Sequence, residues 1–387
     1  MSSNKAEKPA IDARTVNARQ ATKLLRTCFK AKRPLFMWGP PGIGKSDIVA
    51  GITADMNGYM VDMRMALMAP DEIRGIPFFN KEKGVMEWAP PEDLPLPGTI
   101  YTVTDKDGKE REVVAEDWPI IVLFLDEMNS APPAVQAAGY QLVLNRRIGK
   151  FIMPDNVVIV AAGNRESDRG VTYRMPSPLA NRFSHVELAV DFDSWFEWAV
   201  NNNVHPDVTG FLASQKQDLF DFKPTQSGRA FATPRSWVFT SDLLYVEDGD
   251  DIDDLIAGTI GDGMAIKFLG HRKFAAALPR AEDILTGKIK NLETKEVSAM
   301  YSLVISLCYE LREQHVKLKA AKKEDEWHAM ANNCFEFWMA NFGTEICVMG
   351  AKVALTNYDL PLVPGKLKCF DRFHKEYGKY IMAAVGQ

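Results

Sequence analysis

The chain has 387 residues, more than one small core requires and enough for two or three domains. Hydrophobic residues make up 46% and charged residues 25%, a balance that excludes a disordered chain. Its apolar runs fall far short of the ~20 residues of a membrane span, and its first ten residues lack the apolar stretch of a secretion signal. A net charge of −5 disfavours a dedicated nucleic-acid surface but leaves local basic patches open. We therefore expect a soluble, cytoplasmic protein.

The N-terminal segment begins with a polar tail at residues 1–12. Apolar residues at helical spacing predict a helix over Ala13–Phe29, with Ala18, Leu24, Leu25 and Cys28 on its apolar face. Residues 34–38 then read as a short apolar strand.

A phosphate-binding loop follows this strand. The pattern G-x-x-x-x-G-K-[ST] is matched by Gly39, Pro40, Pro41, Gly42, Ile43, Gly44, Lys45 and Ser46. Gly42 and Gly44 permit backbone conformations that aim several N–H groups at one point, and the helix that follows adds its partial positive charge. Lys45 can reach the β- and γ-phosphates of ATP, and the Ser46 hydroxyl can bind Mg²⁺. The loop therefore predicts a site for ATP and Mg²⁺.

A long stretch between this loop and the next buried strand predicts inserted hairpins at about 76–114. Gly84 lies among alternating residues in the first of them. Asp107-Gly108, flanked by alternating Thr, Val and Tyr, indicates the turn of the second.

Two carboxylates follow the next strand. Ile120–Leu125 is a continuous apolar run that predicts a parallel strand buried on both faces. Asp126 and Glu127 stand at its carboxyl end, where ligands bind in open α/β sheets. Asp126 would hold Mg²⁺ through its hydration shell, and Glu127 would orient and polarise the attacking water. Solvated acids at an ordinary strand end are the alternative, which the preceding phosphate loop disfavours.

A third strand is predicted over Val157–Gly163, with Asn164 directly after it. Asn164 could hydrogen-bond the γ-phosphate or the attacking water. Asn after Gly is also a common turn pair, so both interpretations stay open at this point.

The order of these elements resembles that of an AAA+ ATPase, and more narrowly that of the MoxR type. Two downstream pieces carry this resemblance, Pro178–Phe183 (PLANRF) and Thr233–Trp237 (TPRSW). Supporting pieces are Met63–Gly75, Trp88–Pro91 and Val135–Gly149. The resemblance covers about residues 12–280. It implies an α/β fold, a P-loop AAA+ nucleotide domain of parallel sheet flanked by helices, with an α-helical lid and an α-helical C-terminal extension.

The resemblance also implies catalytic roles that spacing does not show. Asn164 matches the sensor 1 position. Arg182 matches the arginine finger, which enters the neighbouring subunit's site, and Arg235 matches sensor 2 in the lid. Five other arginines remain rivals for the finger or for contacts between subunits: Arg146, Arg147, Arg165, Arg169 and Arg174.

In the resembling family, insertions such as the first hairpin face the pore of the ring and help to engage substrate. The candidate side chains are Phe78, Phe79, Met86 and Trp88. A small core of the hairpin itself is the equally open alternative.

The remaining chain turns helical after Asp191. We expect the nucleotide domain at 13–190, the lid at 191–277 and the extension at 278–387. The five cysteines (Cys28, Cys308, Cys334, Cys347 and Cys369) are scattered and are expected to be buried free thiols. The six histidines show no ligand spacing, so no metal is expected beyond the nucleotide's Mg²⁺.

The expected function is that of an ATP-hydrolysing ring motor, homo-oligomeric and hexameric, which remodels or activates a protein client. Proteins of the MoxR type commonly work with a von Willebrand factor type A-domain partner, which is expected here too. One alternative is a nucleic-acid motor or helicase loader, in a phage or replication context, which the acidic charge balance disfavours. Another is an ATP-gated assembly scaffold, which the presence of Glu127, Asn164, Arg182 and Arg235 disfavours.

Overall fold

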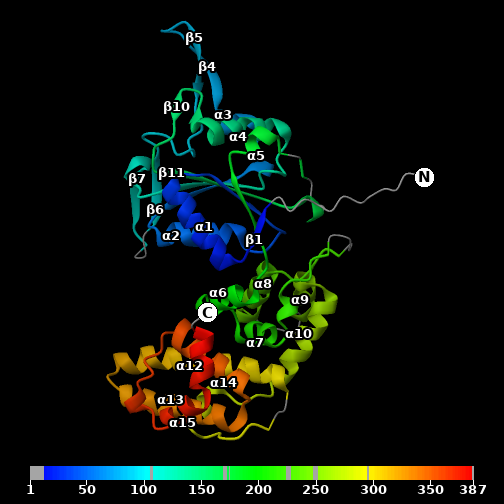
Figure 1. Cartoon of the computed structure of the whole chain (residues 1–387), viewed down its shortest axis with the longest axis vertical. Coiled ribbons are helices and arrows are strands. Elements are labelled where there is room, and N and C mark those ends of the chain that lie inside the picture. The colour runs from blue at the N-terminus through cyan, green and yellow to red at the C-terminus, as the bar shows by residue number, and fades with distance from the viewer. Residues whose placement is uncertain are drawn as a thin grey trace, which may run out of the picture. The chain divides into compact units, whose positions relative to one another are not determined.

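The computed structural model describes residues 13–104, 108–168, 172–173, 175–223, 228–246, 252–293 and 296–385. The predicted polar tail, the middle of the second predicted hairpin turn, Arg169 and Arg174 lie outside these residues. The chain divides into two compact units, Met1–Asp191 and Phe192–Gln387 (Figure 1).

Six parallel strands form the main sheet of the first unit, in the order β1-β12-β2-β11-β8-β3. Their bounds are β1 Arg14–Val16, β2 Leu35–Trp38, β3 Tyr59–Arg64, β8 Ile121–Asp126, β11 Val157–Gly163 and β12 Ser184–Leu188. The apolar residues of β8 and all of β11 are buried, as expected for central parallel strands covered on both faces. The predicted α/β fold class is confirmed.

Helices cover both faces of this sheet. Helices α1 and α2 lie on one side, and α3, α4 and α5 on the other (Figure 1). Their bounds are α1 Ala18–Ala31, α2 Lys45–Asp55, α3 Pro70–Arg74, α4 Pro133–Asn145 and α5 Ser177–Ala180. Val135 and Leu142 of α4 share a buried core with alternate residues of β8, among them Leu123. The unit is therefore a three-layer sandwich with the sheet in the middle.

The first helix begins later than the sequence predicts. Strand β1 occupies the start of the predicted helix, and α1 begins after Asn17, whose side chain accepts from the backbone N–H of Gln20 at 2.9 Å. The buried face consists of Ala21, Leu25 and Phe29. Leu24, which was expected on the apolar face, is 37% exposed, so that part of the prediction is wrong.

Three antiparallel hairpins extend from this unit. They are β4 Ile76–Asn80 with β5 Val85–Ala89, β6 Ile100–Thr104 with β7 Glu110–Val114, and the short pair β9 Arg147–Ile148 with β10 Phe151–Ile152. The four candidate side chains on the first hairpin are between 44% and 60% exposed: Phe78, Phe79, Met86 and Trp88. Such exposure does not fit a buried core of the hairpin, the alternative that the sequence left open.

The second unit is helical. Its helices are α6 Phe192–Asn201, α7 Pro206–Ser214, α8 Pro234–Tyr245, α9 Ile252–Ile260, α10 Asp262–Ala275, α11 Ala281–Leu285, α12 Val297–Ala320, α13 Glu324–Asn341, α14 Thr344–Lys352 and α15 Phe370–Val385. Helix α7 packs so tightly on α12 that a side chain at Gly210 would collide with Ser302. His271 of α10 also lies 2.9 Å from the Ser302 hydroxyl. The predicted lid and extension therefore lie in one compact unit, and their division at 277 stays a prediction.

All five cysteines are free thiols. Four of them are buried in the core of the second unit, Cys308, Cys334, Cys347 and Cys369, as predicted. Cys28 on α1 is only partly buried, which differs from the prediction. Burial raises the pKa of the Cys369 thiol to about 11, so this thiol stays protonated and unreactive at neutral pH.

Candidate functional site

The predicted phosphate loop connects β2 to α2 at the carboxyl edge of the sheet. Gly44 precedes the first residue of α2 with a φ of 86°, a left-handed conformation that glycine adopts without steric cost. It offers no side-chain hydrogen bond to the helix, so the N–H groups of the first turn remain for another acceptor. The Lys45 ammonium donates to the carbonyls of Gly39 at 2.7 Å and Pro40 at 2.9 Å. The loop thus gathers positive charge at a helix N-terminus, as an anion site requires.

Side chains from three separate segments meet beside this loop. The Ser46 hydroxyl lies 3.3 Å from an oxygen of Asp126, the last residue of β8. The Lys45 ammonium lies 3.3 Å from the side-chain oxygen of Asn164, which follows β11. Because β8 and β11 are parallel neighbours, their carboxyl ends reach the same edge of the sheet. The sheet therefore brings together residues that are 80 and 119 positions apart in sequence.

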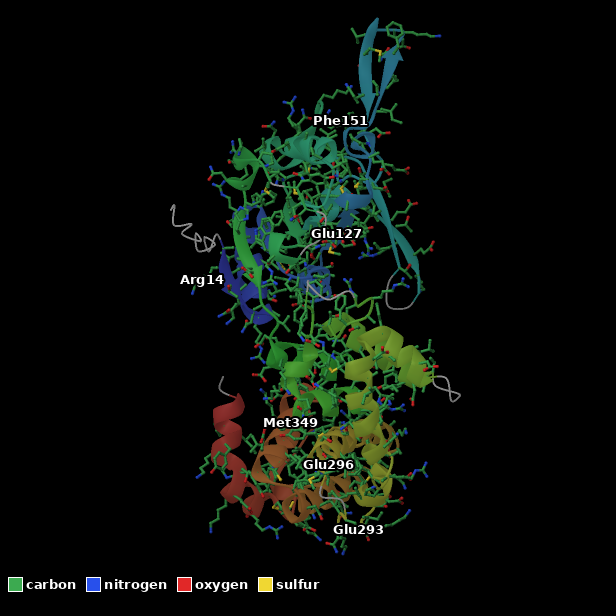
Figure 2. The ribbon with its side chains drawn as sticks, turned by 90° about the vertical axis from the view of Figure 1, so that its right-hand side faces the viewer. Arg14, Glu127, Phe151, Glu293, Glu296 and Met349 are labelled. Atoms are coloured by element: carbon green, nitrogen blue, oxygen red, sulfur yellow. The ribbon has the colours of Figure 1, made fainter. Side chains whose placement is uncertain are left out.

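Glu127 stands at this edge in a strained backbone conformation (Figure 2). Its φ is 53°, a left-handed value that costs a non-glycine residue roughly 1–2 kcal/mol. Its backbone N–H donates to the Asp126 carboxylate at 2.9 Å, and its side chain is exposed. Backbone strain of this kind is often found at functional sites.

Asn129 is a member of this site that the sequence did not reveal. Its side chain is buried and clamps the backbone of Asn164, donating to the carbonyl at 2.7 Å and accepting from the N–H at 3.2 Å. A side chain at Gly163 would overlap Asn129, so the glycine makes room for this clamp. In the sequence, Asn129 is notable only for following Asp126 and Glu127 within three positions. That closeness does not identify the backbone of Asn164 as its partner.

Asp62 and Arg64 on β3 were also missed. The parallel pairing of β3 with β8 places Arg64 opposite Asp126. Burial raises the pKa of the Asp62 carboxyl, and the negative charge of Asp126 raises it further, against the lowering effect of Arg64. The direction of this shift reflects repulsion between the Asp62 and Asp126 carboxylates across the strand pair. The two acids place negative charge at the carboxyl edge of the sheet.

Three of the five rival arginines are held by other groups of their own chain. The Arg165 guanidinium pairs with Asp168 at 2.8 Å and with Glu187 at 2.8 Å. Arg146 donates to the carbonyl of Pro154 at 2.9 Å, and Arg147 donates to the carbonyl of Gly149 at 2.9 Å. The other two, Arg169 and Arg174, lie outside the described residues.

The two arginines that the resemblance singles out are both exposed. Arg182 stands in the turn between α5 and β12. Arg235 belongs to the second unit, in the first turn of α8. Neither belongs to the hydrogen-bonded group of Lys45, Ser46, Asp126 and Asn164, and their roles stay predictions.

The residues at this edge fit a nucleotide with its Mg²⁺. A hydroxyl and a carboxylate 3.3 Å apart are the hard oxygen donors that Mg²⁺ takes beside phosphates. Lys45 and the start of α2 supply positive charge to phosphate oxygens. Among the described residues, no group of three or more His, Cys, Asp and Glu side chains could hold a metal ion by itself.

Comparison with known proteins identifies a protein family for the segment that contains this site. Residues 35–189 match the family "ATPase family associated with various cellular activities (AAA)". The first unit thus contains an AAA-type nucleotide-binding domain, which confirms the AAA+ part of the predicted resemblance. The match covers 155 of the 387 residues, and the helical second unit lies outside it. No curated protein sequence matches it.

Several solved structures match the chain at low identity and with TM-scores below 0.5. They include a proposed ATPase of Cytophaga hutchinsonii ATCC 33406, with 12% identity, a TM-score of 0.33, and 89% of this chain and 82% of that chain covered. NtrX of Brucella abortus in complex with ATP has 16% identity and a TM-score of 0.36, with 78% and 67% covered. The RuvB Holliday junction branch migration motor of Thermotoga maritima has 16% identity and a TM-score of 0.34, with 70% and 75% covered. Likeness at this level defines neither the activity nor the partner of the chain.

None of the helices that the structure describes is both long enough and apolar enough to span a bilayer.

Proposed function

We propose that the chain is an ATP-hydrolysing AAA+ ring motor of the MoxR type, which remodels or activates a protein client in the cytoplasm. The observation that carries this proposal is the hydrogen-bonded group of Lys45, Ser46, Asp126 and Asn164 at one edge of the sheet. It combines a phosphate loop, an acid and a polar strand end, the three parts that nucleotide hydrolysis needs.

Binding of ATP is assigned to residues 39–46. On binding, the Lys45 ammonium exchanges the carbonyls of Gly39 and Pro40 for phosphate oxygens, which bear more negative charge. Ser46 and Asp126 would hold Mg²⁺, and the bound ion would neutralise charge that develops on the phosphates. This assignment explains why a serine and an aspartate from distant segments face each other.

Hydrolysis is assigned to Glu127 and Asn164. The exposed Glu127 carboxylate orients a water molecule and accepts its proton as the water attacks the γ-phosphorus, while ADP leaves with the electrons of the broken bond. Asn164 hydrogen-bonds the water or the γ-phosphate, and Lys45 and Asn129 hold it in place from two sides.

A ring is assigned because one exposed arginine fits a role between subunits. Arg182 is exposed in the turn between α5 and β12, and Arg146, Arg147 and Arg165 each bind groups of their own chain. In a hexameric ring, Arg182 reaches the site of the neighbouring subunit as the arginine finger, and Arg235 serves as sensor 2. Hydrolysis then depends on assembly.

The first hairpin is assigned to the client. Phe78, Phe79, Met86 and Trp88 expose apolar surface that folding of this chain leaves uncovered. Such side chains bind unfolded or extended segments of another protein. A von Willebrand factor type A-domain protein is the proposed partner that delivers the client.

Release of phosphate from ATP tests the proposal. The purified chain should hydrolyse ATP with Mg²⁺, and Lys45→Ala should lower the rate at least ~100-fold and weaken ATP binding, because the loop loses its only side-chain cation for the phosphates. The matched control is Lys81→Ala at an exposed position of the first hairpin, which should hydrolyse ATP like the wild type. A wild type without turnover, or a Lys45→Ala variant with normal turnover, would overturn it.

Asn129→Leu should lower kcat about 10–100-fold and leave ATP affinity within a few-fold, because it releases the backbone of Asn164 and leaves every residue of the phosphate loop in place. Asn156→Leu is the matched control. Asn156 precedes the opposite end of β11 and donates to the carbonyls of Ala115 and Trp118 at 2.8 Å. Both variants should lose thermal stability, and only Asn129→Leu should lose kcat. Equal kcat values in the two variants would show that Asn129 is merely structural.

A further inference from the structure

The solvent-exposed side of α1 is strongly basic. Residues 14–33 contain seven Lys and Arg residues and no Asp or Glu, within a chain whose net charge is −5. All seven are exposed. The seven are Arg14, Arg19, Lys23, Arg26, Lys30, Lys32 and Arg33, and we call the four that lie on α1, Arg19, Lys23, Arg26 and Lys30, the α1 basic face. Arg14, labelled in Figure 2, stands on the edge strand β1 that leads into the helix.

Four of these residues form one stripe along the helix. Arg19, Lys23, Arg26 and Lys30 are spaced by four, three and four residues, so they follow one another on a single side. The stripe spans about 16 Å, because a helix rises 1.5 Å per residue. The opposite side, Ala21, Leu25 and Phe29, is at most 4% exposed and is buried in the unit.

This arrangement does not serve the stability of the helix. Like charges one turn apart each destabilise a helix by about 0.2–0.5 kcal/mol, and the stripe contains three such neighbouring pairs. The first turn also lacks the acidic residues that would favour a helix N-terminus. The capping box at Asn17 and the buried apolar side hold the helix instead.

Two acids of the first unit lie within ion-pair distance of these seven basic residues. Arg26 pairs with Asp55 at 3.5 Å, and Lys32 pairs with Asp155 at 3.5 Å. Both pairs are exposed to solvent, where ion pairs contribute little and are readily exchanged for a stronger anion. A polyanion with regularly spaced charges can therefore compete for the whole stripe.

We propose that the α1 basic face binds the phosphate backbone of a nucleic-acid duplex. A duplex carries one negative charge per ~1.7 Å of its axis, enough to pair every cation of a straight stripe about 16 Å long. A single strand is disfavoured, because the exposed residues of α1 include no aromatic side chain on which a base could stack. A membrane surface is disfavoured, because the apolar side of α1 is already buried. The binding is expected to be independent of sequence, since contacts of Lys and Arg with phosphates carry no sequence information.

The test uses the full chain and a fluorescent 20-base-pair DNA duplex, with anisotropy measured between 50 and 200 mM salt. Wild type should bind, with an affinity that falls steeply as salt rises. The double variant Lys23→Glu, Lys30→Glu should bind at least ~10-fold more weakly, with the slope of log K against log salt smaller by roughly two. The matched control, Lys317→Glu with Lys319→Glu on exposed positions of α12, makes the same change of charge in the second unit and should bind like the wild type. ATP binding should be the same in all three proteins.

Four outcomes would overturn the proposal. They are no binding by the wild type at 50 mM salt, equal loss in the control variant, tighter binding of the single strand than of its duplex, and displacement of the duplex by an equal charge concentration of poly-glutamate. The last result would assign the face to an acidic protein. The experiment needs no ATP hydrolysis, so its failure leaves the proposed ATPase untouched, and failure of the ATPase leaves this surface untouched.

Discussion

Glu127→Gln is expected to lower the rate of ATP hydrolysis by about 10²–10⁴-fold and to leave ATP binding intact. The amide keeps the size of the side chain and its exposed position, but it cannot accept a proton from the attacking water. The steady-state rate of phosphate release measures hydrolysis, and equilibrium binding of a fluorescent ATP analogue measures affinity. Glu112→Gln, the same change at an exposed position on β7, is the control and should hydrolyse at the wild-type rate.

Normal turnover by Glu127→Gln would contradict the role of Glu127 and direct attention to Asp62, the other acid near Asp126. Loss of ATP binding together with hydrolysis would mean that the change disturbs the phosphate loop. In that case the result would say nothing about proton transfer, and the melting temperature would show the damage.

Arg182→Ala is expected to have the other large effect, a loss of roughly 10³–10⁵-fold in hydrolysis, because an arginine finger stabilises charge on the transferring phosphoryl group. Inactive Arg182→Ala subunits mixed with inactive Lys45→Ala subunits should recover part of the activity. In such rings some intact sites receive an intact finger from their neighbour. Phosphate release as a function of the mixing ratio measures this recovery.

Arg165→Ala is the matched control for Arg182. Arg165 is bound within its own chain to Asp168 and Glu187, so its loss should lower the melting temperature, and mixing with Lys45→Ala should not rescue any activity lost with it. Absence of rescue for Arg182 in rings shown to be mixed would contradict its assignment as the finger.

The parts of the fold that were predictable are those that short stretches of sequence specify. The loop at residues 39–46, the strand before Asp126 and the strand before Asn164 each combine an apolar run with a polar end, and each lies where that pattern predicts. Their meeting was predictable too, because parallel strands present their carboxyl ends at one edge.

Residues that act through packing were not predictable. Asn129 binds a backbone segment that comes into contact only because Gly163 leaves room for it. Asp62 comes close to Asp126 through the pairing of β3 with β8, and the ion pairs of Arg165 with Asp168 and Glu187 form only in the folded chain. No local pattern marks any of these partners.

The packing of helices in the second unit was not predictable from the sequence either. Apolar spacing predicted helices in it, but spacing does not say which helix a given face will meet. The close approach of α7 to α12 at Gly210 depends on a residue without a side chain opposite Ser302, a match between positions about ninety residues apart.

That contact has a consequence for how the chain can change. Helix α7 lies before residue 277 and α12 after it, yet each supplies the surface against which the other is buried. The last 110 residues therefore cannot be exchanged between relatives as an independent cassette, because a graft would strip α7 of its packing partner. A substitution at Gly210 or at Ser302 should therefore disturb both helices at once, whereas substitutions at exposed positions of this unit leave their contact intact.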